Sequence, residues 1–142
     1  MNVENTCVLK LDHLVFDDLH FRRKGFANKN DVKYRFGFHF ETPEDNVIVA
    51  HILVECDKDS EYELSVRTSG YFFLELDSPY NSILLRQNAA AIVFPYVRSQ
   101  ISILTAQPEV DSVILPPINI AQIIQKASEE ECGSTSSCAS EP

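Results

Sequence analysis

One stretch of the chain, residues 89–119, restricts the possible folds more than any other part of the sequence. A run of small and apolar residues reaches Phe94, Pro95 follows it, and a second helix-like run extends from Tyr96 to Ala106. Proline has no backbone N–H and its ring clashes with the preceding turn, so Pro95 should break or kink this long helix. The stretch ends at 115–119 in Leu-Pro-Pro-Ile-Asn, which is extended because each proline restricts the residue before it.

The chain before this stretch has the period-two pattern of β-strands. Residues 32–41 alternate between apolar and mostly polar side chains, residues 47–56 are rich in β-branched side chains, and residues 61–68 alternate again before Gly70. The apolar face of the first of these strands consists of Val32, Tyr34, Phe36, Phe38 and Phe40. Two interpretations of the phenylalanine row at 36, 38 and 40 stay open: plain core, or a row of which part lines an open groove.

An earlier strand, residues 8–16, is apolar on both parities. Leu9 and Leu11 have one parity, whereas Leu14 and Phe16 have the other. This pattern fits a strand that is covered on both faces, or a strand at a contact between subunits.

Short turns at 42–46 and 57–60 join the later strands, which predicts an antiparallel sheet. After the strands, Ser78 can cap the long helix with Pro79 at its first position. Residues 120–127 can form a short last helix. Because the apolar face of the sheet needs a cover, we expect an α+β fold with the helices on one side.

The length of 142 residues, 44% of them hydrophobic, suits one domain with a substantial core. We expect this domain over residues 1–127, followed by a disordered, acidic and Ser-rich tail over 128–142. The net charge of -9 argues against nucleic-acid binding, which needs a basic surface. An acidic surface suits solubility or a basic partner.

No apolar run approaches the roughly 20 residues that span a bilayer. The first residues contain acids where a signal peptide has a basic leader and an apolar block. We therefore expect a soluble, cytoplasmic protein with no direct membrane insertion. Its four cysteines form no CxxC pair and should stay reduced, and the role of Cys132 and Cys138 in the tail is open.

The residues that usually carry catalysis do not form a recognisable set in this sequence. The four histidines fall in or next to strands, in no HxH, HExxH or Cys–His arrangement, so we expect strand residues rather than metal ligands: His13, His20, His39 and His51. Four glycines in the whole chain make no phosphate loop. We expect no enzyme activity, no metal and no cofactor.

Two proline motifs carry a resemblance to a known family. They are Phe94-Pro95-Tyr96-x-Arg98 and Leu115-Pro116-Pro117-Ile118-Asn119, with weaker support from residues 18–21 and 70–72. In this order, over about residues 8–125, the chain resembles the SecB family of protein-export chaperones. The resemblance implies a four-stranded antiparallel sheet covered on one side by a long broken helix and a short C-terminal helix. It also implies a homotetramer, built as a dimer of dimers with the first strand and the long helix at the contacts.

The resemblance implies an ATP-independent holdase that binds unfolded preproteins and keeps them competent for export. Apolar side chains between sheet and helix would form the client-binding groove: Tyr34, Phe36, Phe38, Phe40, Val66, Phe72, Phe94, Tyr96, Leu115 and Ile118. Residues 115–118 are then a flap over the groove, or otherwise a rigid connector. Acids near strand ends would dock the SecA motor ATPase, or otherwise form a solvated face: Asp17, Asp18, Glu61 and Glu63.

The chain departs from the family pattern at several positions. Ala90 and Ala91 stand where the family commonly has Pro-Asn, and Arg22 stands where an acid is usual. The first loop, residues 22–31, is shorter than usual. Docking on the motor is the expectation that these changes weaken most. Two alternatives remain: a SecB-like chaperone of a toxin–antitoxin system, and a small acidic adaptor that binds one folded partner.

Overall fold

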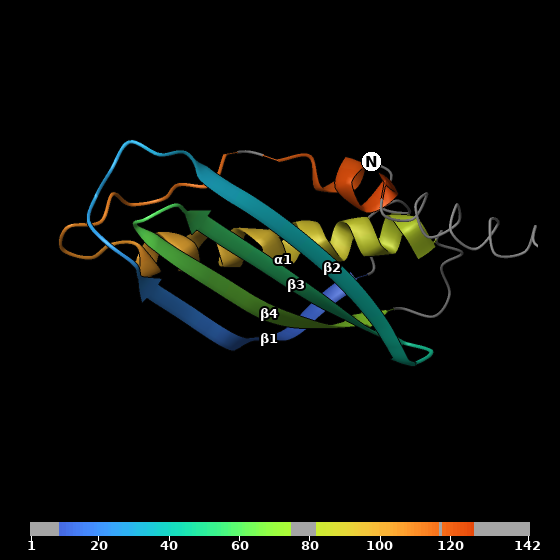
Figure 1. The fold of residues 1–142 in the computed structure, drawn as a ribbon. Coiled ribbons are helices and arrows are strands. Elements are labelled where there is room, and N and C mark those ends of the chain that lie inside the picture. Colours follow the sequence, from blue (N-terminus) through green and yellow to red (C-terminus); the bar gives the residue numbers. More distant parts are fainter. Residues whose placement is uncertain (1–8, 75–81, 117, 127–142) are drawn as a thin grey trace, which may run out of the picture.

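The computed structural model describes residues 9–74, 82–116 and 118–126. In this part of the chain, four strands form one sheet, a long helix lies across one of its faces, and a short helix covers residues 120–126 (Figure 1). The elements are β1 (Leu9–Arg23), β2 (Val32–Glu44), β3 (Val47–Lys58), β4 (Tyr62–Leu74) and α1 (Ser82–Leu104). We call the face that α1 covers the inner face and the opposite one the outer face.

The sheet is antiparallel throughout, with the strand order β1-β4-β3-β2. Short turns join β2, β3 and β4, whereas the loop after β1 crosses to the far edge of the sheet. Both β1 and β2 are therefore edge strands. The sequence-based prediction of an α+β fold with four antiparallel strands is confirmed.

Two β-bulges in β1 explain why this strand is apolar on both parities. The register with β4 shifts between Leu11 and His13 and again between Phe16 and Asp18, so Asp12 and Asp17 are extra residues. After each bulge the inward-facing residues change between odd and even positions, while they stay on the same face of the sheet. The expectation of a strand apolar on both faces is wrong, because one row pairs with inner-face residues of β4: Leu9, Leu11, Leu14, Phe16, Leu19 and Phe21.

The long helix runs through Pro95 without interruption, which corrects the expectation of a broken helix. In a helix, Pro95 leaves the carbonyl of Ala91 without its donor four residues ahead. Both residues are exposed, so that carbonyl lies on the side of α1 where water can reach it. The side of the helix that faces the sheet stays packed on it, and the helix continues to Leu104.

The core lies between the inner face and the buried side of α1. Ala89, Ala90, Val93, Val97 and Ile101 of α1 are fully buried. They pack on the inner face of β3 and β4, where the following side chains are less than 5% exposed: Ile48, Ala50, Ile52, Val54, Cys56, Tyr62, Leu64, Val66 and Phe72. The helix packs mainly on β4, β3 and β1, which leaves β2 less covered than the rest of the sheet.

The turn between β3 and β4 holds a buried ion pair. Glu61 has no exposed surface, and its Oε1 atom accepts hydrogen bonds from Lys58 Nζ at 2.9 Å and from the Asn28 N–H at 2.9 Å. Desolvation is the largest single influence on this carboxyl and raises its pKa. The hydrogen bonds from Lys58 and Asn28, together with the charges of Lys58 and Arg23, outweigh it and lower the pKa of Glu61 below its ordinary value. This turn thereby anchors the loop that crosses from β1 to β2.

Two parts of the sequence-based prediction lie outside the described residues: the helix cap at Ser78 and the acidic tail with Cys132 and Cys138. The last helix is confirmed over residues 120–126. Among the described residues, no helix has the length and apolar character needed to cross a bilayer.

Replacing Thr68 by valine should stabilise the protein by about 1 kcal/mol. The Thr68 side chain has no exposed surface, and among the described residues its Oγ1 atom has no hydrogen-bond partner. A buried hydroxyl without a partner is destabilising, and valine has nearly the same shape. Urea unfolding should show a higher midpoint.

Thr105→Val is the matched control for this change. The Thr105 hydroxyl donates to the Ile101 carbonyl at 2.9 Å and accepts from the Val113 N–H at 2.8 Å. Its removal should lower the midpoint, because a buried N–H loses its acceptor. A lower midpoint for Thr68→Val would show that its hydroxyl has a partner in solution.

Candidate functional site

A row of aromatic side chains on the inner face of β2 is only partly covered. Tyr34 is 37% exposed, and Phe36, Phe38 and Phe40 are partly buried. They pair with Cys56, Val54, Ile52 and Ala50 of β3, so they extend the core beyond the edge of α1. We call Tyr34, Phe36, Phe38 and Phe40 the aromatic strip.

The aromatic strip is positioned by contacts with α1. The rings of Tyr34 and Phe36 stack with centroids 6.4 Å apart, and Phe36 lies 6.3 Å from the ring of Phe94. At the other end, the guanidinium carbon of Arg86 lies 5.7 Å from the centre of the Phe40 ring, at cation–π distance. The strip is therefore ordered along its length while one of its sides stays accessible.

The segment after α1 returns along the helix in the opposite direction (Figure 1). Ser102 donates to the Val113 carbonyl at 2.9 Å, and Gln87 donates to the Ala121 carbonyl at 3.2 Å. Within this segment, Leu115 is fully buried and Ile118 is partly buried against the core.

The predicted groove residues separate into two groups in the structure. The strip residues and Ile118 keep some accessible surface. Val66, Phe72 and Leu115 have none, so they are core residues in this conformation, and Phe94 is 6% exposed beneath Phe36.

Tyr96 does not join the strip. It is 50% exposed, but it follows Phe94 by two positions, which in an α-helix places it about 200° further round. The two side chains therefore lie on opposite flanks of α1, with Phe94 on the flank that meets β2. Sequence reasoning grouped them because both belong to the same motif.

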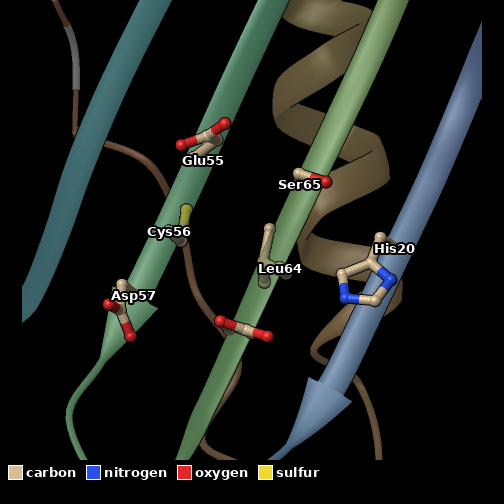
Figure 2. Close-up of a pocket in the computed structure, with 7 residues that line it drawn as sticks. His20, Glu55, Cys56, Asp57, Leu64 and Ser65 are labelled. Carbon is tan, nitrogen blue, oxygen red and sulfur yellow. The ribbon is translucent and has the colours of Figure 1, made fainter.

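The outer face of the sheet has a shallow hollow rich in acidic side chains. Figure 2 shows it between β1, β4 and β3, lined by His20, Glu55, Cys56, Asp57, Glu63, Leu64 and Ser65. The acids are largely paired: Glu55 with Arg35 at 2.5 Å, Asp57 with Lys24 at 2.7 Å and Glu63 with Arg22 at 3.8 Å. The hollow is therefore less negative than its acids alone indicate.

The thiol of Cys56, which is buried on the inner face behind this hollow, is not a reactive group. Desolvation by burial raises the pKa of Cys56 to about 12. A thiol with this pKa is protonated near neutral pH and is a poor nucleophile or metal ligand.

Three of the four predicted docking acids share the outer face. Asp17 and Asp18 are exposed on β1, and Glu63 lies opposite Arg22 in the register of β1 with β4. Glu61 does not share this surface, because its side chain is fully buried against Lys58. Its position in the short turn gave no sign of burial in the sequence.

All four histidines lie on the outer face, a feature that the sequence analysis missed. His13 stacks on Tyr71 with ring centroids 4.3 Å apart, and His39 stacks on His51 at 5.8 Å. Alternation placed His39 opposite the aromatic strip, but only the register of the strands brings it beside His51. In the described ranges, no three His, Cys, Asp or Glu side chains form a group that could hold a metal ion.

The chain was compared with known families, proteins and structures. No family model matches it. An uncharacterized protein of Methanocaldococcus jannaschii is 28% identical, in an alignment that covers 91% of this chain and 90% of the relative. A structure of a protein of unknown function from Streptococcus agalactiae has a TM-score of 0.46 at 12% identity, covering 77% of this chain and 97% of that one.

One solved structure decides the fold. It is the SecB-like chaperone of Mycobacterium tuberculosis in complex with a ChAD peptide from the HigA1 antitoxin. Its TM-score with this chain is 0.60 at 13% identity, over 78% of this chain and 90% of the chaperone. The chain has a SecB-like fold. At this level of identity the likeness concerns the arrangement of strands and helices, and function must be argued from the surfaces described above.

Proposed function

We propose that this protein is an ATP-independent holdase, which binds apolar segments of unfolded chains along the aromatic strip. The observation that carries the proposal is the partial exposure of this aromatic row at the β2 edge of the core. The fold supports it, since a SecB-like chaperone with the same fold is seen with a bound peptide. The accessible side chains of the client site are Tyr34, Phe36, Phe38, Phe40 and Ile118, with Phe94 beneath them.

The energetics of the strip suit binding without strict sequence preference. A fully buried client side chain contributes about 1.5–3 kcal/mol, so a few apolar residues of an extended segment give useful affinity. Aromatic side chains accept many apolar partners, and the Arg86 guanidinium over Phe40 keeps a polar group at one end of the strip. No catalytic group is required for this activity.

The proposal includes an assembly and a partner. Exposed apolar side chains on α1, including Leu84, Tyr96 and Ile103, would be covered in a homotetramer. Asp17, Asp18 and Glu63 on the outer face would contact a basic partner such as SecA, with Glu61 left out of this surface. In this role the protein acts in the cytoplasm on unfolded preproteins before export.

A second candidate function is favoured by the peptide in the similar structure, which comes from an antitoxin. The protein would then be the chaperone of a toxin–antitoxin system with one preferred client. Binding measurements on a panel of unfolded proteins and antitoxin-derived peptides separate the two. One peptide bound far more tightly than every unfolded preprotein would favour the toxin–antitoxin role.

A thermal aggregation assay tests the holdase directly. At equimolar amounts, the protein should suppress aggregation of a reduced or slow-folding client, and Tyr34→Ala and Phe38→Ala should each weaken client binding roughly threefold to tenfold. Phe26→Ala is the matched control, because Phe26 is 82% exposed in the loop after β1 and lies outside the strip. If the wild-type protein leaves aggregation unchanged, the holdase proposal is wrong. If Phe38→Ala lowers only stability, Phe38 is a core residue.

A further inference from the structure

A chain of hydrogen-bonded side chains crosses the outer face and takes one residue from each strand. His51 on β3 lies between two partners: its Nδ1 atom is 2.7 Å from Ser69 Oγ on β4, and its Nε2 atom is 3.2 Å from Glu41 Oε2 on β2. The Ser69 hydroxyl in turn donates to Asp17, the bulge residue of β1. We call Glu41, His51, Ser69 and Asp17 the cross-sheet chain.

The protons in this chain can be assigned from the donors and acceptors present. The Ser69 hydroxyl has one proton, and it is donated to the Asp17 carboxylate, which only accepts. Ser69 Oγ must therefore accept from His51, so Nδ1 carries a proton. The Glu41 carboxylate also only accepts, so the second contact is a hydrogen bond only when Nε2 carries a proton too. The complete chain thus requires the imidazolium form of His51.

The surroundings of His51 allow it to exchange protons with solvent. Its side chain is 30% exposed and borders an outer-face hollow that His39, Glu41 and Arg67 also line. Ser69 is 1% exposed, so the middle of the chain is closed to water, whereas Asp17 at its far end is exposed. The Asp17 and Glu41 carboxylates favour a positive imidazole, whereas Arg67 and a protonated His39 oppose it. The helix α1 contributes no group here, because it packs on the inner face.

We propose that His51 is a proton-dependent clamp, which in its charged form fastens the edge strand β2 through Glu41 to β4 and to the bulge of β1. When His51 loses its Nε2 proton, a lone pair faces the Glu41 carboxylate and this link to β2 is lost. Nδ1 keeps its proton, because the single Ser69 proton is donated to Asp17 and Ser69 Oγ can only accept from the ring. The inference does not depend on the proposed function, although the clamped strand is the one that carries the aromatic strip.

The direction of the pH dependence follows from the two charged members. The hydrogen bond from His51, and then the charge of His51, hold the pKa of Glu41 below its ordinary value. A carboxyl with a lowered folded-state pKa stabilises the fold above its unfolded pKa, about 4.3, and loses this effect as the pH falls through the folded value. On the alkaline side the link is lost when the His51 imidazolium gives up its Nε2 proton. The clamp therefore holds only while Glu41 is ionised and His51 is charged.

Nitrogen-15 NMR of the imidazole rings tests the clamp at its centre. At pH 5.5 both ring nitrogens of His51 should be protonated. At pH 8 the neutral ring should carry its proton on Nδ1. Neutral histidine in solution usually carries it on Nε2, so this result would distinguish His51 from a free imidazole. An Nε2-protonated ring at pH 8 would overturn the proton assignment and with it the proposal.

Amide hydrogen exchange tests the effect on β2. After correction for intrinsic rates, the protection of amides in residues 38–42 relative to those of β4 should fall roughly twofold to fivefold between pH 6 and pH 8. Glu41→Gln should abolish this change without unfolding the protein, because Glu41 is exposed. Glu55→Gln, which removes an outer-face carboxylate bound to Arg35, should retain it. Equal pH dependence in Glu41→Gln and wild type would refute the clamp.

Discussion

Replacing Gly70 by valine should prevent α1 from closing on the sheet and leave the chain largely unfolded at ambient temperature. A Cβ atom at Gly70 would lie 2.5 Å from Cγ2 of Val93 and 3.1 Å from a ring carbon of Phe72. Both neighbours are fully buried, so neither side chain has free space to move into. Even alanine should cost about 2–3 kcal/mol, and valine adds two further methyl groups at the same point.

Urea unfolding followed by far-UV circular dichroism measures this effect. Gly37→Ala is the control, since a Cβ there would lie 3.6 Å from Leu53 Cβ, an ordinary contact, and its midpoint should change little. A second check is the double variant Gly70→Ala with Val93→Ala, which removes the clashing methyl group. Its destabilisation should be smaller than the sum of the single changes. An additive double variant would mean that the helix does not rest on Gly70.

Replacing Lys58 by methionine should destabilise the protein by about 3–5 kcal/mol, because it leaves the buried Glu61 carboxylate without its charged partner. The Lys58 side chain is 8% exposed and that of Glu61 is 0% exposed. The Oε2 atom of Glu61 has no hydrogen-bond partner among the described residues. Few interactions therefore compensate the buried charge of this carboxylate once Lys58 is removed. Lys33→Met is the control, since Lys33 is 73% exposed and 3.6 Å from Asp59.

The pH dependence of the Lys58→Met variant gives a sharper test. In the wild type the lowered pKa of Glu61 means that stability is lost as the pH falls through the folded value. Without Lys58, desolvation dominates and favours the neutral carboxylic acid, so the gap in stability between variant and wild type should narrow at acidic pH. A gap that stays constant from pH 7 to pH 4 would show that Glu61 is not buried as a charged group.

The strands were visible in the sequence because an antiparallel sheet with one covered face imposes period two on its residues. The row from Val32 to Phe40 was found in this way and lies on the inner face as one row. In β1 the same rule assigned side chains to the wrong faces, because the amino-acid sequence does not distinguish a bulge at Asp12 from a change of face. The break expected at Pro95 does not occur, and the carbonyl that Pro95 leaves without a donor belongs to the exposed Ala91.

The candidate sites were harder to predict because they depend on partners that are distant along the chain. Ser69 is 18 residues from His51 and 52 from Asp17, and only the registers of β4 with β3 and with β1 bring them together. Burial of Glu61 likewise depends on Asn28, 33 residues away in the loop after β1. The aromatic strip was predicted because its residues alternate along one strand. Its exposure could not be predicted, because it depends on how far α1 extends over the inner face of the sheet.

The strand order also sets a sequence of events during synthesis. β1 is made first, but its partner β4 is made last among the strands, with Leu9 paired to Leu74 and Arg23 paired to Tyr62. A growing chain therefore holds a finished β1 with an unpaired apolar row until about residue 74 has left the ribosome. The hairpin of β2 and β3 can close in the meantime, since only a short turn separates these strands.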